Sequence, residues 1–178
     1  HSIHTAMKDQ IAMLASNRKE NSVIPDMNIL ENMYLSEHTL SAWKPAISKK
    51  KEIERYKKYK EMLNIKANSC EDLITSLSGG NQQKVVIAKW LAMKPNILIM
   101  DEPTRGIDIG AKSEIYALMR KMTEQGMSII MISSEMSEVM QVSDRILVMH
   151  EGSISGELTA EEVTRNNIMQ AAFGGVKE

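Results

Sequence analysis

The stretch ILIMDEPT, residues 97–104, joins a short apolar strand to two adjacent acids. Four apolar residues in a row, Ile97 to Met100, are typical of a strand that is buried on both faces, and Asp101 and Glu102 follow at its end. Ligands of open parallel sheets bind beyond this end of the strands. In phosphate-transfer sites one such acid can hold Mg²⁺ and a second can orient or activate the attacking water. Taken alone, however, an Asp-Glu pair after a strand is more often a helix cap or a surface turn.

A second stretch, LSGGNQQK at residues 77–84, stands before the helical pattern VVIAKWLA. Ser78, Gly79 and Gly80 lie where this helix is expected to begin. Glycines let the backbone approach a ligand closely, and the free N–H groups and the dipole of a helix start favour an anion. Taken alone, this pattern is better explained as a serine-capped helix after a flexible turn. One helix and a turn separate the two stretches, and their combination is far less expected by chance than either part.

The rest of the sequence alternates strands with helices. Strands are predicted at residues 10–15, 96–100, 128–133, 145–149 and 153–157. Besides the helix after residue 78, helices are predicted at residues 27–35, 46–63, 111–124, 136–142 and 159–173. A polar turn is expected at residues 16–21. Apolar strands separated by helices predict an α/β fold with a largely parallel sheet that is covered on both faces.

Composition limits the class of protein. The chain has 178 residues with 22 basic and 23 acidic side chains, and 43% of its residues are hydrophobic. These values exclude a disordered tail and a basic nucleic-acid arm. The apolar runs are far shorter than the roughly 18 residues that span a bilayer. A single cysteine and the absence of a signal segment in HSIHTAMKDQ favour a reducing cytoplasm.

The run KKKEIERYKKYK, residues 49–60, holds seven basic residues and two tyrosines, which would suit a nucleic-acid interface. The favoured interpretation is a solvated helix face with ion pairs, because Glu52, Glu54 and Glu61 stand three or four residues from lysines. The four histidines show no spacing typical of a structural zinc site.

Together the two stretches resemble the ATPase subunits of ABC transporters. LSGGNQQK is similar to their signature motif, ILIMDEP to their Walker B strand, and GID around Asp108 to their D-loop. The resemblance covers nearly the whole chain and implies a partial P-loop NTPase fold over residues 1–178. Within it we expect a helical subdomain at about residues 27–92, and the Walker B strand, D-loop and C-terminal region at about residues 93–178.

Finer features resemble one branch of this family. DEPTRGIDIGAKSEIY at residues 101–116, Asn81 after the two glycines, and ISSEMSEV at residues 132–139 are similar to the second ATPase half of tandem monosaccharide importers. No G-x-x-x-x-G-K-[ST] P-loop occurs in the sequence. The resemblance therefore implies the part of a C-terminal ATPase half that follows the Walker A motif.

The implied function is ATP-driven import of a monosaccharide such as ribose, with ATP and Mg²⁺ as cofactors. The implied partners are the N-terminal ATPase half of the same polypeptide, transmembrane permease subunits and, indirectly, a sugar-binding protein; no nucleic acid is expected. The implied location is peripheral, at the cytoplasmic face of the cell membrane. Two alternatives stay open: a soluble ABC-type ATPase that acts on nucleic acid or the ribosome, and an inert interaction fragment.

The resemblance also assigns roles to residues. Glu102 is the expected catalytic residue, and Asp101 is the expected ligand of Mg²⁺. Where most relatives carry a glutamine and a switch histidine, this sequence has Ser16 and Ser134, and a serine cannot replace a histidine as a clamp on the terminal phosphate. The expected ATP-binding residues are Ser78, Gly79, Gly80, Asn81, Gln82, Asp108, Ser16 and Ser134.

The two serines in place of the glutamine and the switch histidine predict an asymmetric mechanism. ABC ATP sites are composite, and the P-loop and Walker B of one half face the signature of the other. The segment from Ser78 to Asn81 is expected to complete the site whose P-loop belongs to the N-terminal half. Asp101 and Glu102 are expected to serve the second site, which lacks its switch histidine. Because it has no P-loop, the isolated chain is expected to be inactive.

Overall fold

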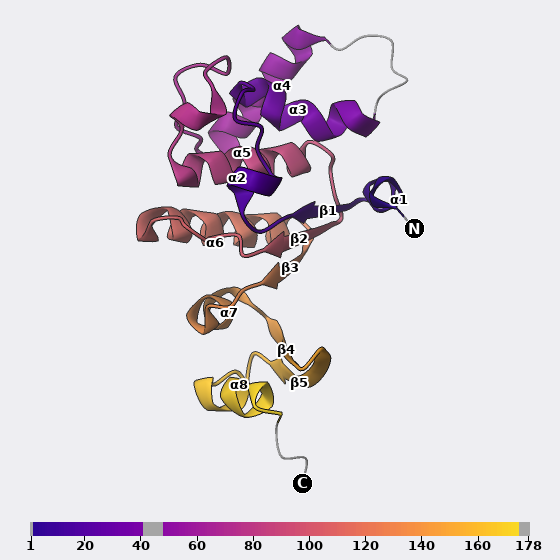
Figure 1. The fold of residues 1–178 in the computed structure, drawn as a ribbon, viewed down its shortest axis with the longest axis vertical. Coiled ribbons are helices and arrows are strands. Elements are labelled where there is room, and N and C mark those ends of the chain that lie inside the picture. The colour runs from indigo at the N-terminus through magenta and orange to yellow at the C-terminus, as the bar shows by residue number, and fades with distance from the viewer. Residues whose placement is uncertain (1, 41–47, 175–178) are drawn as a thin grey trace. The chain divides into compact units, whose positions relative to one another are not determined.

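The computed structural model describes residues 2–40 and 48–174 (Figure 1). The chain divides into two compact units, one that runs to Ile132 and one that begins at Ser133. None of the helices in these described ranges is both long and apolar enough to cross a membrane.

The first unit is built on a parallel sheet of three strands, β1 (Ile11–Leu14), β2 (Ile97–Asp101) and β3 (Ser128–Ile132). Their order in the sheet is β1-β2-β3. The expected parallel pairing of these three segments is therefore confirmed.

Two long helices connect the strands, α5 (Gly79–Leu91) before β2 and α6 (Ile109–Glu124) before β3. The strand order advances in the same direction twice, so right-handed crossovers place both helices on one face of the sheet. Side chains on one face, Ala12, Leu14, Leu98 and Met100, are accordingly buried. On the other face Met13, Ile130 and Ile132 are about half exposed. In the first unit, one face of the sheet is therefore covered by helices, and these side chains on the other face are partly exposed.

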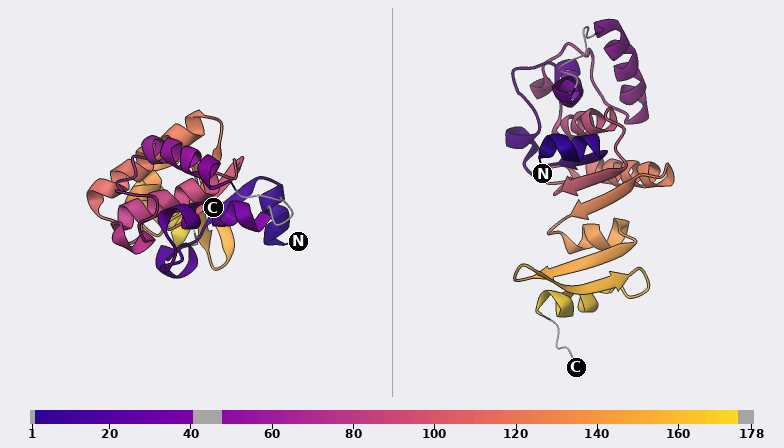
Figure 2. Two further views of the ribbon diagram at one scale, coloured as in Figure 1. Left: turned by 90° about the horizontal axis from the view of Figure 1, so that it is seen from above. Right: turned by 90° about the vertical axis from the view of Figure 1, so that its right-hand side faces the viewer.

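The first unit also contains a group of helices on one side of the sheet, in which α3 packs on α5 (Figures 1 and 2). α3 begins with a capping box: Glu31 N–H donates to Asn28 Oδ1, and Asn28 N–H donates to Glu31 Oε2, both at 2.9 Å. The helical segments besides α5 and α6 are α1 (Ile3–Lys8), α2 (Arg18–Asn21), α3 (Ile29–Leu40), α4 (Lys49–Met62) and the 3-10 turn η1 (Ile74–Ser76).

Most of these helices were expected from the sequence. α3 and α4 confirm the helices predicted at residues 27–35 and 46–63, although residues 46–47 lie outside the described ranges. α1 and α2 were not expected. α1 forms because Ser2 caps it, with its Oγ accepting a hydrogen bond from Thr5 N–H at 3.2 Å. α2 occupies part of the segment predicted as a polar turn.

The basic run on α4 is tied to α3 by an ion pair and a hydrogen bond. Arg55 contacts Glu37 at 2.9 Å and lies over the ring of Tyr34, and Glu52 contacts His38 Nε2 at 2.6 Å. These pairs join two helices, whereas the sequence spacing predicted pairs along a single helix. Outward-facing lysines of the run are exposed, as a solvated helix face requires: Lys50, Lys51, Lys57 and Lys58.

The second unit is a hairpin covered by a helix. β4 (Arg145–His150) and β5 (Ser153–Thr159) pair antiparallel around a turn in which Glu151 and Gly152 have φ values of 46° and 79°. A two-residue connection permits only antiparallel pairing of β4 with β5, and among the described residues these two strands form a sheet of their own. Ile146, Val148 and Ile168 form the core of this unit.

Two helices complete the second unit, α7 (Met136–Val142) and α8 (Arg165–Ala172). α7 confirms the helix predicted at residues 136–142. The predicted start of the last helix at Thr159 is wrong, because β5 extends to that residue. The helix begins instead after Thr164, whose side chain accepts a hydrogen bond from Asn167 N–H at 3.1 Å.

The contact between α5 and α6 leaves no room for a side chain at Gly80. A Cβ atom there would lie 2.7 Å from Ala111 Cβ. We therefore expect Gly80→Ala to lower the free energy of unfolding by about 1–3 kcal/mol, as overpacking does. Adding Ala111→Gly should recover part of this loss, because the second change removes the colliding atom. Urea unfolding of the two variants checks both expectations, and equal stability of Gly80→Ala and wild type would contradict the close contact.

A buried lysine makes the stability of the first unit depend on pH. Lys89 on α5 is 7% exposed, and its Nζ donates to Ser22 O at 2.7 Å. Burial lowers the pKa of the Lys89 ammonium from about 10.5 to about 8. Between these two values the unfolded chain binds more protons than the folded chain, so this group makes the free energy of unfolding rise with pH.

We expect wild type to gain about 2–3 kcal/mol relative to Lys89→Met between pH 7 and pH 10. Urea unfolding of both proteins at the two pH values measures this difference, and the Met variant serves as the control for every other group that titrates. A constant difference across this range would contradict the lowered pKa.

Candidate functional site

The carboxyl edge of the parallel sheet brings Ser16 and Asp101 together. Asp101 is the last residue of β2, and Ser16 follows the neighbouring strand β1. Ser16 N–H donates to Asp101 Oδ2 at 3.4 Å. Since parallel neighbours end at the same edge of a sheet, this contact follows from the pairing of β1 with β2.

Glu102 has an unusual backbone conformation at this edge. Its φ is 46°, which lies in the left-handed region and costs about 1–2 kcal/mol for a residue with a side chain. Its N–H donates to Ile132 O at 2.9 Å, and its carbonyl accepts from Arg105 N–H at 3.1 Å. The chain thus turns sharply directly after Asp101.

The acids at this edge suit Mg²⁺ that arrives with phosphate. Asp101 and Glu102 are both partly exposed. Residues 2–40 and 48–174 contain no group of three or more His, Cys, Asp and Glu side chains that could hold a metal. Mg²⁺ commonly takes one or two carboxylates and completes its shell with phosphate oxygens and water. The pair therefore fits a metal bound together with a nucleotide better than a metal held by protein alone.

The signature-like stretch begins helix α5, as the sequence predicts. Ser78 is the N-cap, and its Oγ accepts hydrogen bonds from Asn81 N–H at 3.5 Å and from Asn81 Nδ2 at 2.9 Å. Gln82 Nε2 donates to Leu77 O at 3.0 Å. Gly79 and Gly80 form the first helical residues, so the free N–H groups of the first turn are available to an anion.

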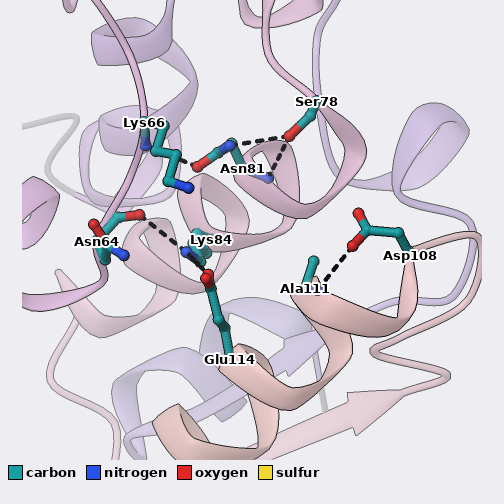
Figure 3. A network of polar contacts seen from close by, with 8 residues as sticks. All are labelled: Asn64, Lys66, Ser78, Asn81, Lys84, Asp108, Ala111 and Glu114. Atoms are coloured by element: carbon teal, nitrogen blue, oxygen red, sulfur yellow. Dashed lines mark hydrogen bonds and ion pairs between the residues drawn. The ribbon is translucent and has the colours of Figure 1, made fainter.

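Asp108 lies beside this stretch at the start of α6 (Figure 3). Its Oδ1 accepts a hydrogen bond from Ala111 N–H at 2.9 Å and so caps the helix. Gly80 packs against Ala111. The structure therefore brings the expected signature and D-loop together through the first turns of two helices.

A buried lysine connects α5 to α6 and to the loop after α4 (Figure 3). The Lys84 side chain is 4% exposed; its Nζ forms an ion pair with Glu114 on α6 and donates to Asn64 O at 2.9 Å. The hydrogen bond from Lys84 holds the pKa of the Glu114 carboxyl below its usual value. Two residues after Asn64, Lys66 N–H donates to Asn81 Oδ1 at 2.8 Å.

The remaining expected residue, Ser134, belongs to the second unit. It follows Ser133, whose hydroxyl donates to Glu138 Oε2 at 2.9 Å. Ser133 Oγ also accepts from Glu135 N–H at 3.0 Å, which shapes the turn into α7.

Sequence reasoning missed Asn64, Lys66, Lys84 and Glu114. Lys84 left a signal, because a lysine among the apolar residues of α5 must find a partner for its charge. Nothing in the sequence identifies that partner, which stands 30 residues further along the chain.

Comparison with known proteins identifies the family. Residues 1–105, more than half of the chain, match the family model described as ABC transporter. The chain belongs to this family. It is 51% identical over 170 residues to the ribose import ATP-binding protein of Oceanobacillus iheyensis, and 48% identical to that of Bacillus subtilis. It is 47% identical to the xylose import ATP-binding protein of Thermoanaerobacter pseudethanolicus.

Each of these alignments covers 96% of the chain and 34% of the relative. The chain thus spans about a third of the length of the curated relatives it matches. They are ATP-binding proteins of ribose or xylose import by name, in agreement with the sugar-importer branch expected from the sequence.

Solved structures confirm the fold. The ADP conformation of MJ1267, an ATP-binding cassette of an ABC transporter, matches with a TM-score of 0.78 over 98% of this chain and 72% of that chain, at 22% identity. A dimeric post-hydrolysis state of the cassette MJ0796 bound to ADP and Pi matches with a TM-score of 0.73 over 88% of this chain and 66% of that chain, at 24% identity. The chain has the α/β fold of an ABC ATPase cassette.

Replacing either member of the Lys84–Glu114 ion pair should lower the free energy of unfolding, but by different amounts. Glu114→Ala leaves the buried Lys84 ammonium without its counter-charge, and we expect a loss of about 1–3 kcal/mol in the free energy of unfolding. Lys84→Met removes the charge and keeps an apolar chain of similar length, so a smaller loss is expected. Urea unfolding ranks the two variants, and a larger loss for Lys84→Met would contradict a buried charge as the source of the cost.

Proposed function

We propose that this chain is part of the ATP-hydrolysing subunit of an ABC importer that takes up a monosaccharide such as ribose. The observation that supports this most directly is the arrangement in Figure 3, in which a serine-capped helix start lies beside the Asp108 cap. Asp101 at the end of β2 and Glu102 directly after it supply the proposed Mg²⁺ ligand and catalytic residue. The names of the sugar-import relatives supply the substrate class.

In this proposal the chain contributes to two composite sites. The first site binds an ATP molecule that is held by the P-loop of the N-terminal half of the same polypeptide. Its phosphates are bound in addition by the segment Ser78, Gly79, Gly80, Asn81 and Gln82 of this chain. The first turn of α5 supplies N–H groups and the positive end of its dipole to those phosphates. Asp108 supports communication between the two sites, because the helix that it caps packs on Gly80.

The sheet edge serves the other site. Asp101 would hold Mg²⁺, whose charge neutralises the phosphate oxygens when it is bound. Glu102 would orient the attacking water or accept a proton from it, and it is therefore the proposed catalytic residue. Ser16 and Ser134 stand where most relatives carry the glutamine and the switch histidine, so this site is proposed to hold nucleotide and hydrolyse it poorly.

Partners and location follow from the same proposal. The N-terminal half, transmembrane permease subunits and, indirectly, a sugar-binding protein complete the importer at the cytoplasmic face of the membrane. An ATPase that acts on nucleic acid is the rival suggested by the exposed lysines of α4. It predicts binding to nucleic acid that weakens steeply with salt.

ATP hydrolysis in a mixture tests the composite site. We expect no hydrolysis by this chain alone and hydrolysis after it is mixed, in the presence of Mg²⁺, with an N-terminal half that carries an intact P-loop. Ser78→Ala should lower the rate in the mixture by about tenfold or more, because a hydrogen bond to a charged group is worth about 1.5–3 kcal/mol.

Glu102→Gln should have the smaller effect, since its site is proposed to hydrolyse poorly. If Ser78→Ala left the rate intact while Glu102→Gln abolished it, the assignment of the two sites would be reversed. Hydrolysis by the chain alone would mean that it holds a phosphate site of its own.

A further inference from the structure

The orientation of the Asn81 side chain is fixed by a backbone donor. Lys66 N–H can only donate, so the atom of Asn81 that faces it at 2.8 Å must be the carbonyl oxygen Oδ1. The amide nitrogen Nδ2 therefore faces Ser78 Oγ, at 2.9 Å. Asn81 thus bridges the loop after α4 and the N-cap of α5 (Figure 3).

This orientation determines what the Ser78 hydroxyl can do. A hydroxyl oxygen has two acceptor positions and one hydrogen. Asn81 supplies donors to both acceptor positions, Nδ2 at 2.9 Å and its backbone N–H at 3.5 Å. Within residues 2–40 and 48–174 the Ser78 Oγ accepts both of these hydrogen bonds and donates none, so the hydrogen of this exposed hydroxyl is free for an acceptor outside the chain.

The loop that carries Lys66 N–H is itself anchored. Asn64, two residues earlier, has a φ of 49°, and its carbonyl accepts a hydrogen bond from the buried Lys84 ammonium at 2.9 Å. Lys84 is held in turn by Glu114 on α6. A continuous series of contacts therefore runs from α6 through this loop to the signature serine.

We propose that Asn81 is a positioning residue whose side chain makes the Ser78 hydroxyl an outward-facing donor to a phosphate oxygen of ATP. This inference rests on the proposed function, in which the segment from Ser78 to Gln82 contacts ATP. It adds a role for the amide side chain of Asn81, which contacts Lys66 N–H and Ser78 Oγ and acts on the nucleotide through Ser78, whereas the backbone of the segment contacts the phosphates directly. The signature segment then binds phosphate through its backbone and through one oriented hydroxyl.

A double-mutant cycle in the mixture with a P-loop-bearing half tests the proposal. We expect Asn81→Ala and Ser78→Ala each to lower kcat by about tenfold, and the double variant to lose no more than the worse single one. Ser76→Ala is the matched control, because the Ser76 hydroxyl donates locally to Leu73 O at 2.8 Å, and it should leave the rate unchanged. A purely structural role of Asn81 would instead give losses that multiply.

Asn81→Asp keeps the test decisive if Asn81→Ala folds poorly. The aspartate retains an acceptor for Lys66 N–H but replaces the Nδ2 donor by an oxygen, to which the Ser78 hydroxyl would then donate. We expect a loss of at least tenfold in the Ser78 background and a clearly smaller loss in the Ser78→Ala background. The second value measures the effect of the added charge, and equal losses in both backgrounds would overturn the proposal.

The outcomes separate this inference from the proposed function. An active mixture with multiplicative losses for Ser78 and Asn81 overturns the positioning role and leaves the composite site standing. A wild-type mixture without hydrolysis overturns the composite site, and the role of Asn81 falls with it. An active mixture with non-multiplicative losses supports both.

Discussion

The ammonium group of Lys84 is the constraint around which the candidate site is arranged. It lies almost fully buried between α5 and α6, where a charge must be paired and hydrogen-bonded. Glu114 supplies the counter-charge and the Asn64 carbonyl a further acceptor. Three segments that are distant in the sequence are thereby held in one place, and the signature helix keeps a fixed relation to the helix capped by Asp108.

This arrangement links packing to chemistry. The close approach of α5 and α6 needs a glycine at residue 80, which is also part of the segment proposed to bind phosphate. The loop held by Lys84 presents the Lys66 N–H that orients Asn81, and Asn81 in turn orients Ser78. A change in the angle between the two helices would therefore reach the hydroxyl that is proposed to contact ATP.

Local sequence signals predicted much of the fold. The strands predicted at residues 96–100 and 128–133 match β2 and β3, because four apolar residues in a row stand between polar turns in each. The starts of α5 and α6 follow from Ser78 and Asp108, which cap N–H groups three residues later. The pairing of the last two strands depended on the connection between them, because a two-residue turn made residues 145–159 an antiparallel hairpin.

The sequence by itself determined the motifs, the family resemblance and the ends of most elements, because these depend on residues within a few positions of one another. Only the tertiary structure decided that Glu114 neutralises Lys84, that Asn64 anchors the loop and that Lys66 orients Asn81. These contacts join residues 30, 20 and 15 positions apart. At such separations neither periodicity nor capping specifies a partner, and only the packing of α5 against α6 and the α4 loop brings the groups within hydrogen-bonding distance.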